Sequence, residues 1–197
     1  MKRLFDCAAA GFGLILIAPV ILAMVPLIRF TSPGPAVFGQ RRVGRDGCEF
    51  TCYKLRTMAA GTREAPTHEI GEASVTGIGR ILRRTKLDEL PQLYNVLAGE
   101  MSLVGPRPCL PLQKDLIRER EIRGVLGILP GITGLGQVLG IDMSDPIRLA
   151  RCDAEYLRKQ SFGYDIRLLW STFFSSARRG LVDPDCLGGF PEDPGGG

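Results

Sequence analysis

The chain opens with its longest hydrophobic stretch. Residues 7–28 form a run of 22 apolar, uncharged residues, and a helix of that length is about long enough to cross the hydrocarbon core of a bilayer. Pro19 lies within the run, where a proline removes a backbone hydrogen bond and kinks a helix. The pattern therefore predicts a membrane helix that is interrupted at Ala18-Pro19.

Basic residues flank this run on both sides. They are Lys2 and Arg3 before it, and Arg29, Arg41, Arg42 and Arg45 after it. Because basic residues stay on the cytoplasmic side of a membrane, the flanks favour a run whose two ends lie on one face. We expect a re-entrant helix–break–helix hairpin over residues 1–30, with a tilted single span as the alternative. A cleaved signal peptide fits less well, because the run is long and residues 22–26 offer no small-x-small cleavage site.

Shorter patterns follow the hydrophobic run. Residues 37–43 and 49–55 predict two short strands, joined by a turn at Arg45-Asp46-Gly47. Helical patterns occupy residues 92–97 and 112–123. Asp145-Pro146 supplies a cap and a first-turn proline for a further helix that runs to about residue 159. The polar segment 59–74 predicts a loop, to which the sequence assigns no role.

A last helix is predicted over about residues 164–178. Its apolar side chains recur with helical spacing, at Ile166, Leu169, Trp170, Phe173, Phe174 and Ala177. This face packs against the core or, with its aromatic rings and with Arg167, Arg178 and Arg179, lies among the lipid headgroups. Residues 187–197 are rich in Gly and Pro without periodicity, which predicts a disordered tail of unassigned role.

Together these patterns predict a mixed α/β, mostly helical protein. The re-entrant membrane helix occupies residues 1–30, and residues 31–186 form a compact cytoplasmic domain with a short β-hairpin and interfacial amphipathic helices. The net charge of +4 is too small to indicate a nucleic-acid partner, but it suits an anionic membrane surface and phosphorylated substrates.

The cysteines do not indicate a disulfide framework or a metal cluster. Six cysteines are scattered along the chain without a C-x-x-C pair, and the chain has one histidine. Cys48 and Cys52 lack two further ligands at zinc spacing. Reduced thiols that face the cytoplasm explain this usage most simply.

Candidate chemistry centres on two adjacent carboxylates, Asp88 and Glu89. Three cations precede them, namely Arg83, Arg84 and Lys86. Pro91 suits the first position of a helix, so the carboxylates lie in the turn that enters it, where the helix dipole and the cations favour their ionised form. An anionic nucleophile among cations is what attack on a phosphate requires.

A purely structural interpretation of the same segment competes with this one. Thr85 and Asp88 have the spacing of a capping box, and Arg84 with Asp88 has that of a surface ion pair along a helix.

Three further segments indicate phosphate binding. Lys54 and Arg56 close the second predicted strand, where they emerge on one face. Arg107 lies between two prolines, whose rings hold its backbone, and a pre-positioned guanidinium favours bidentate phosphate contact. The glycine-rich segment 130–137 is an ordinary turn or a ligand contact, since no Walker lysine follows it.

These motifs, in their order, resemble the bacterial sugar transferases, the monotopic phosphoglycosyl transferases that start glycan assembly on a polyprenyl phosphate carrier. The resemblance covers roughly residues 1–182 and indicates the minimal form, without an additional N-terminal membrane bundle. It is carried by the N-terminal apolar hairpin and by residues 40–44 (QRRVG), 53–58 (YKLRTM), 83–97, 101–108 (MSLVGPRP), 130–134 (PGITG) and 164–166 (YDI). Lys86 stands where the family usually has serine, and Glu100 where aspartate is common.

The resemblance implies a two-step exchange at the cytoplasmic face of the bacterial inner membrane. Asp88 would attack the sugar-bearing phosphate of a UDP-sugar and release UMP, and polyprenyl phosphate would then take the phosphosugar from the enzyme. Glu89 would assist proton transfer, and Mg²⁺ would bridge Asp88 and the diphosphate, which agrees with the preference of Mg²⁺ for one or two carboxylates plus substrate phosphate. The phosphate oxygens would be neutralised by Lys54, Arg56, Arg83 and Arg107.

Two alternatives stay open at this stage. The chain could be a membrane-bound phosphotransferase or nucleotidyl-processing enzyme with another acceptor, or a membrane-anchored, non-catalytic assembly protein of a glycan pathway. The sequence assigns neither the sugar nor the pathway, and it leaves a homo-oligomer open.

Overall fold

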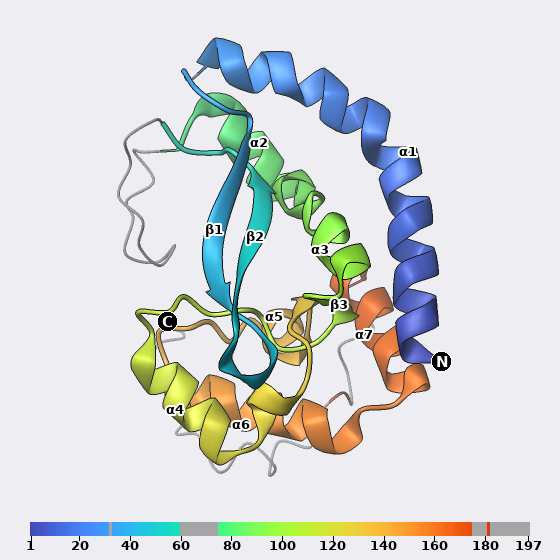
Figure 1. Ribbon diagram of the computed structural model, residues 1–197, viewed down its shortest axis with the longest axis vertical. Helices are drawn as coiled ribbons and strands as arrows, with labels where there is room; N and C mark the ends of the chain where they lie inside the picture. Colours follow the sequence, from blue (N-terminus) through green and yellow to red (C-terminus); the bar gives the residue numbers. More distant parts are fainter. Residues whose placement is uncertain (32, 60–74, 175–180, 182–197) are drawn as a thin grey trace, which may run out of the picture.

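The computed structural model describes residues 1–31, 33–59, 75–174 and 181. It is mixed α/β and mostly helical, as predicted, with the β1–β2 hairpin near the centre and α1 arching along one side (Figure 1). The elements are α1 (Lys2–Thr31), β1 (Val37–Val43), η1 (Arg45–Gly47), β2 (Glu49–Leu55), α2 (Gly77–Thr85), η3 (Leu87–Glu89), α3 (Gln92–Ala98), β3 (Ser102–Val104), α4 (Lys114–Ile122), η4 (Val125–Gly127), β4 (Gly131–Thr133), α5 (Leu135–Leu139), α6 (Pro146–Lys159) and α7 (Phe162–Phe173).

The predicted hairpin is confirmed. β1 and β2 pair antiparallel from Val37 opposite Leu55 to Val43 opposite Glu49. At the turn, Asp46 has φ 57° and Gly47 has φ 75°, both in the left-handed region that Asp and Gly tolerate best.

A second, parallel pair of strands was not predicted. β3 pairs with β4, with Ser102 opposite Gly131 and Val104 opposite Thr133. The backbones approach so closely that a Cβ on Gly131 would lie 2.1 Å from the backbone nitrogen of Gly105. This close approach explains why the 130–134 segment needs glycine.

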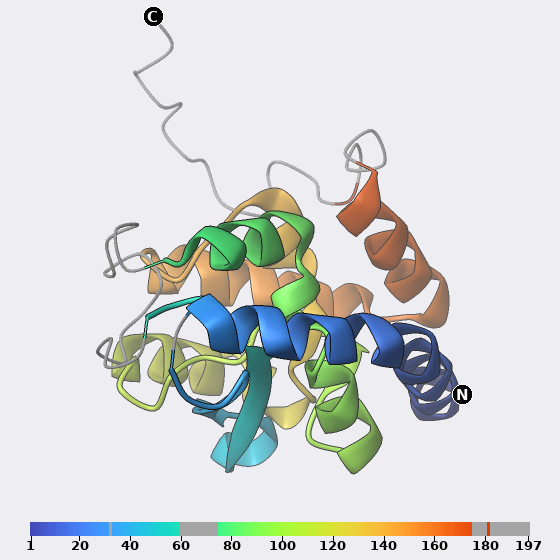
Figure 2. The same ribbon diagram turned by 90° about the horizontal axis from the view of Figure 1, so that it is seen from above.

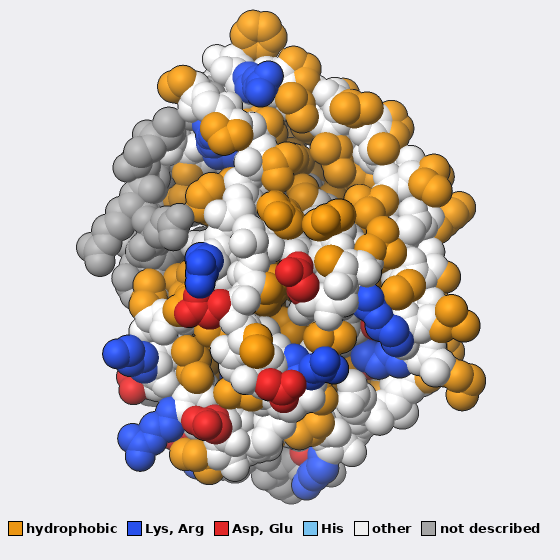
Figure 3. Space-filling view, in the orientation of Figure 1, with side chains coloured by type: hydrophobic (Ala, Val, Ile, Leu, Met, Phe, Trp, Pro, Cys, Tyr) orange, Lys and Arg blue, Asp and Glu red, His pale blue; other side chains and the backbone are white. Residues whose placement is uncertain are grey.

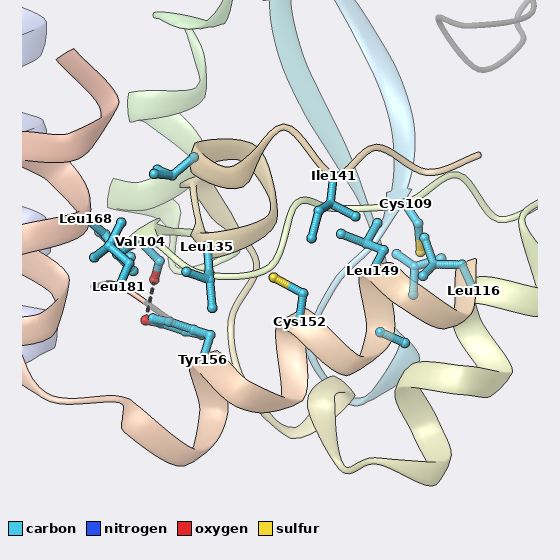
Figure 4. Close-up of a cluster of buried hydrophobic side chains, with 13 residues drawn as sticks. Val104, Cys109, Leu116, Leu135, Ile141, Leu149, Cys152, Tyr156, Leu168 and Leu181 are labelled. Carbon is cyan, nitrogen blue, oxygen red and sulfur yellow. Dashed lines mark hydrogen bonds between the residues drawn. The ribbon is translucent and has the colours of Figure 1, made fainter. Parts of the chain in front are cut away.

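The main hydrophobic core lies between α6, the β3–β4 pair and α7. Tyr156, Leu149 and Cys152 of α6 are buried there, and the hydroxyl of Tyr156 donates a hydrogen bond to the carbonyl of Val104 at 3.1 Å (Figure 4). A smaller cluster, which includes Ala10, Cys52, Leu93, Val96 and Met101, packs α1 and β2 against α3.

Helix α1 is one bent helix. It continues through Pro19 and Pro26, so the predicted interruption at Ala18-Pro19 is not confirmed; an interior proline removes a hydrogen bond and bends a helix without necessarily ending it. The bend is visible in Figure 1. By length and composition, α1 is the one helix in the described part of the chain that could cross a membrane.

Both ends of α1 contact the rest of the protein. Near its start, Lys2 Nζ lies 2.6 Å from Asp165 Oδ2 of α7, next to which this part of α1 lies in Figure 2. Near its end, Ile28 is buried in a cluster that includes Leu55 and Leu82. Between these ends the apolar side chains are largely exposed, and hydrophobic side chains cover this edge of the molecule in Figure 3.

The other predicted helices are confirmed with shifts at their ends. α6 begins after Asp145, whose side chain accepts from the N–H of Arg148, and it ends at Lys159 as expected. α4 begins at Lys114, two residues later than predicted, because residues 110–113 form a turn in which Gln113 Oε1 accepts from the N–H of Leu110. α7 begins at Phe162, because Ser161 caps it.

Some predictions fall wholly or largely outside the described residues. They concern the 59–74 loop, of which residue 59 is described, the 187–197 tail, Ala177, Arg178 and Arg179.

Candidate active site

The turn between α2 and α3 carries the two adjacent carboxylates. Lys86 ends α2 with φ 57°, in the left-handed region, and the single 3-10 turn η3 then presents Asp88 and Glu89. Pro91 precedes the first residue of α3, within one residue of its predicted place.

The predicted capping box is wrong. The hydroxyl of Thr85 donates to the carbonyls of Ile81 and Leu82 within its own helix, so it is turned away from Asp88. Helix α3 begins at Gln92, and its N-cap residue, Pro91, makes no side-chain capping hydrogen bond. No ion pair joins Arg84 and Asp88 among the contacts of the described residues.

Glu89 is held by two cations from distant parts of the sequence. Its Oε1 accepts a hydrogen bond from Arg107 Nη2 at 2.8 Å and one from Lys54 Nζ at 3.2 Å. Burial alone would raise the pKa of Glu89, but the charges and hydrogen bonds of Arg107 and Lys54 outweigh it and lower the pKa to about 2. Glu89 raises the pKa of Arg107 in turn. The structure therefore brings three of the predicted site residues into contact.

Asp88 is adjacent in sequence but differs in environment. Within the described part of the chain its carboxylate forms no ion pair, and burial together with the neighbouring Glu89 raises its pKa. Lys54 and Arg83 oppose this rise in pKa through their charges alone. Asp88 is thus a partly buried carboxylate that no cation neutralises by direct contact.

The remaining predicted cations lie further from this contact. Arg83 donates through Nε to the hydroxyl of Thr57 at 3.0 Å. Arg56 donates through Nη1 to the carbonyl of Pro33 at 2.6 Å and packs over Gly34. Arg56 follows the end of β2, so the strand alternation that placed it beside Lys54 no longer applies, and the structure does not group these two residues.

Three supporting residues were not predicted. Thr57 is buried and fixes Arg83. Arg42 and Gln40 are buried on β1, and Arg42 Nη2 donates to Gln40 Oε1 at 2.6 Å. The signal that could have found Gln40 and Arg42 is the QRRVG motif, in which alternate residues of a strand point to one side.

The donor set suits a metal that binds together with a substrate. The described residues contain no group of three or more His, Cys, Asp or Glu side chains placed to hold an ion. Mg²⁺ binds readily to one or two carboxylates plus substrate phosphate. Asp88, which no cation pairs directly, is the carboxylate of this turn that can accept such an ion without breaking an existing ion pair.

The site can therefore hold a phosphorylated ligand. Lys54, Arg83 and Arg107 supply cationic donors, and Asp88 supplies a carboxylate on which the charges of Lys54 and Arg83 act. Preorganised cations of this kind stabilise the charge that develops on a phosphate under attack.

Comparison with known proteins agrees with this chemistry. A family model described as "Bacterial sugar transferase" matches residues 1–179. A UDP-glucose:undecaprenyl-phosphate glucose-1-phosphate transferase of Caulobacter vibrioides is 39% identical over 180 residues, covering 87% of this chain and 67% of the relative. The exopolysaccharide production protein ExoY of Rhizobium meliloti is 35% identical, covering 87% and 83%. A UDP-N-acetylgalactosamine-undecaprenyl-phosphate N-acetylgalactosaminephosphotransferase of Aeromonas hydrophila is 36% identical, covering 87% and 42%.

Proposed function

The chain belongs to the bacterial sugar transferase family, and from this premise we propose that it moves a sugar-1-phosphate from a UDP-sugar to polyprenyl phosphate. Two of the relatives named above, those of Caulobacter vibrioides and Aeromonas hydrophila, have undecaprenyl phosphate in their names as acceptor and differ in the sugar, which is glucose in one and N-acetylgalactosamine in the other. The proposal accordingly rests on the shared phosphate chemistry. The observation that carries it is the contact of Glu89 with Lys54 and Arg107 beside an unpaired Asp88.

In the first step Asp88 is the nucleophile. A carboxylate oxygen of Asp88 forms a bond to the sugar-bearing phosphorus while the bond from that phosphorus to the UMP oxygen breaks, and UMP leaves with the electron pair. The raised pKa of Asp88 favours this role, because a more basic carboxylate is a better nucleophile. Bound at Asp88 together with the donor, Mg²⁺ would neutralise charge on the diphosphate.

Arg107 and Lys54 bind Glu89 in the free enzyme and bind the donor diphosphate when it arrives. In the free enzyme Arg107 and Lys54 hold Glu89 in its ionised form with a pKa of about 2, which makes it a poor proton acceptor. An arriving diphosphate competes for these two cations. As they turn towards it, the pKa of Glu89 rises towards its ordinary value and Glu89 becomes able to accept a proton.

In the second step polyprenyl phosphate is the nucleophile. Glu89 accepts its proton, an oxygen of the lipid phosphate forms a bond to the phosphorus held by Asp88, and the Asp88–phosphorus bond breaks. The products are polyprenyl diphosphate sugar and free Asp88. A covalent intermediate lets one site serve a soluble donor and a lipid acceptor in succession.

The placement of α1 supports a monotopic enzyme. Lys2 and Ile28, near opposite ends of the helix, both contact the same domain. A helix that crossed the bilayer would carry these ends to opposite faces. We propose that α1 enters the cytoplasmic leaflet of the inner membrane and returns, keeping Asp88 at the depth of the acceptor phosphate.

A non-catalytic assembly role has less support. It would require Asp88 and Glu89 to cap a helix, but Thr85 bonds within α2 and Glu89 binds two distant cations.

Trapping the intermediate tests the proposal. The purified protein in detergent is mixed with Mg²⁺ and a panel of UDP-sugars, and intact-mass spectrometry follows the addition of one phosphosugar. We expect the adduct and UMP release in wild type and in Asp115→Asn, an exposed aspartate on α4 that serves as the control. Asp88→Asn should show neither, and an adduct that persists in Asp88→Asn contradicts the assignment of the nucleophile.

A further inference from the structure

The backbone that carries Arg107 is held by two buried guanidinium groups. Arg120 Nη1 donates to the carbonyl of Arg107 at 2.9 Å, and Arg42 Nη1 donates to the carbonyl of the next residue, Pro108, at 2.9 Å. Arg42 lies on β1 and is 8% exposed, while Arg120 lies on α4 and is 2% exposed. Two separate elements thus reach one dipeptide.

Each of these guanidinium groups is itself held in place. Arg42 donates through Nε and Nη2 to Gln40 Oε1, at 3.2 and 2.6 Å. Arg120 donates through Nε to Asp153 Oδ2 at 2.9 Å, and Asp153 is 2% exposed on α6. The contacts therefore extend from the core helices to the carbonyl groups beside the site.

Stability alone does not account for this arrangement. Burial of a charged guanidinium costs free energy, which a neutral partner such as Gln40 offsets only in part. Burial and the charge of Arg107 lower the pKa of Arg42 to about 10, so Arg42 keeps its charge near neutral pH despite this cost. Apolar residues of similar size would often fill such positions at least as stably.

The arrangement gives the Arg107 segment a single position. The N–H of Gly105 donates to the carbonyl of Thr133 at 2.9 Å, and the N–H of Gly131 donates to the carbonyl of Pro106 at 2.9 Å. Together with the two guanidinium contacts, every residue from 105 to 108 has a fixed backbone group. The Arg107 side chain then leaves a rigid base and reaches Glu89 at 2.8 Å.

We infer that Arg42 and Arg120 are positioning residues that fix the backbone at Arg107 and so direct its guanidinium to Glu89 and to the phosphate of the donor. The inference rests on the proposed function for the donor and on the contacts above for the positioning. A small displacement of a group that stabilises charge lowers the reaction rate strongly, because the group acts only when it lies close to the atoms on which charge develops.

A double-mutant cycle separates positioning from general support of the fold. Arg42→Lys keeps the charge but cannot bind Gln40 and the carbonyl of Pro108 with the geometry of a guanidinium. We expect it to lower kcat/KM for the UDP-sugar by about tenfold. In an Arg107→Ala background the same change should cost less than about twofold, because the group that it positions is gone. Arg41→Lys, at the exposed neighbour that pairs with Glu49, is the matched control and should stay within about twofold of wild type.

Additive losses across the cycle would overturn the inference, since a structural role lowers the rate whether or not Arg107 is present. The same cycle is repeated with Arg120→Lys in place of Arg42→Lys, and the Tm of every variant is recorded to show that it is folded. If Arg120→Lys does not fold, Gln40→Met replaces it, because this change removes only the acceptor that orients Arg42. The Gln40→Met variant should show the same dependence on Arg107.

A readout without turnover distinguishes this inference from the proposed function. Phenylglyoxal modifies accessible arginines, and peptide mass spectrometry reports its rate at Arg107. We expect Arg42→Lys, but not Arg41→Lys, to raise that rate several-fold. An unchanged rate contradicts the positioning, whereas a wild type that releases no UMP from any UDP-sugar contradicts the proposed function alone.

Discussion

Two neighbouring carboxylates in this protein meet opposite electrostatic conditions. Glu89 touches Arg107 and Lys54 and has a pKa of about 2, while Asp88 touches no cation directly and has a raised pKa. Environments that push two pKa values apart commonly assign different roles to the two groups. In the proposed mechanism these environments assign the attack to Asp88 and leave Glu89 paired with its two cations until the donor arrives.

This division predicts the behaviour of Glu89→Gln. We expect the variant to form the phosphosugar adduct at a reduced rate and to lose more in transfer to the lipid, because only the second step needs Glu89 as a base. Rapid quenching separates the first release of UMP from steady turnover. Glu119→Gln is the control, because Glu119 pairs with Arg123 and this pair includes no residue of the candidate site. Complete loss of adduct in Glu89→Gln, equal to that in Asp88→Asn, would contradict the division.

Lys86 offers a stability test beside the same turn. Its φ of 57° is costly for a residue with a Cβ, by roughly 1–2 kcal/mol, and glycine is the usual residue at such a helix end. We expect Lys86→Gly to raise the free energy of unfolding by about 1 kcal/mol, which is roughly 2–4 °C in Tm for a chain of this size. Lys86→Ala removes the same charge and keeps the strain, so an equal gain in both variants would contradict the argument.

For single residues, the sequence predicted which side chains belong to the site better than it predicted which of them touch. Lys54, Glu89 and Arg107 were each identified, but from three separate motifs, and only folding shows that they touch. Arg56 was grouped with Lys54 because side chains two apart on a strand share a face. β2 ends at Leu55, so this rule no longer applied to Arg56. Arg42 was identified as a basic flank of the membrane run and as part of the QRRVG motif, but not as a site residue, because no local pattern shows that a charged side chain is buried.

At the scale of elements, the first turns of α1 are attached to the domain by polar contacts. Lys2 Nζ donates to Asp165 Oδ2 and to the carbonyl of Val104, and Asp6 Oδ2 accepts from the hydroxyl of Ser102 at 2.7 Å. Arg3 donates to the carbonyls of Val96 and Leu97 near the end of α3, where the helix dipole favours a cation. Lys2 and Arg3, which were predicted only as basic residues that stay on the cytoplasmic side of a membrane, therefore also form specific contacts with the rest of the protein.

Breaking one of these contacts should loosen α1. Asp165 is buried and also accepts from the hydroxyl of Tyr156 at 2.7 Å. We expect Asp165→Asn to lower the free energy of unfolding by about 1–3 kcal/mol, because it leaves the polar groups around it poorly paired. Lys2→Met should cost less, since Lys2 is partly exposed and Asp165 retains Tyr156.

The combined variant shows whether the two residues act through each other. In the Lys2→Met, Asp165→Asn protein the Tm loss should be smaller than the sum of the single losses. Losses that simply add would mean that the contact contributes nothing to the stability of α1.

Elements with strong local patterns were predicted well, and those formed by distant contacts were missed. The hairpin and α6 match their predicted ends. α2 was missed because GIGRILRRT is short and holds two glycines, which lower its helix propensity. Its Gly79 packs so tightly that a Cβ would lie 2.0 Å from the carbonyl oxygen of Thr57. Local sequence cannot show such a contact, nor the pairing of three-residue strands far apart in the chain.

The predicted apolar stripe of α7 is divided between core and surface, and of its members Leu169 packs against the main core. Leu168, which lies outside the stripe, is fully buried in the core. Ile166, Trp170 and Phe174, which lie within it, are exposed by 40–61%, and the rings of Trp170 and Phe174 stack. The interpretation that the whole stripe packs on the core is therefore wrong. The exposed aromatic row agrees with the other interpretation, a helix at the level of the headgroups.

At the scale of the whole molecule, the exposed apolar side chains of α1 and α7 lie close together. The N-terminal part of α1 touches the start of α7, where the rings of Phe5 and Phe162 meet edge to face at 5.2 Å. Exposed Phe12, Ile15 and Leu16 continue along α1. Large exposed apolar surfaces mark contact with a membrane or a protein, and here the exposed side chains lie on the one helix of the described residues that could cross a membrane. In the proposed monotopic arrangement, the edge formed by α1 and α7 is the part of the molecule that faces the lipid.

The same geometry makes the topology of α1 testable by labelling. Leu4 lies at the start of α1 with 77% of its surface exposed, and the native Cys48 is exposed on the domain. In a background in which Cys7 and Cys186 are serine, a membrane-impermeant maleimide should label Leu4→Cys and Cys48 from the same side, in inside-out vesicles and not in intact spheroplasts. The physical reason is that Lys2, near Leu4, contacts Asp165 of the domain that carries Cys48, so these positions cannot be separated by a bilayer while that contact holds. The variant that lacks Leu4→Cys provides the baseline labelling of Cys48 alone. Labelling of Leu4→Cys from the periplasmic side would mean that α1 spans the membrane and that its contacts with α7 do not form in the cell.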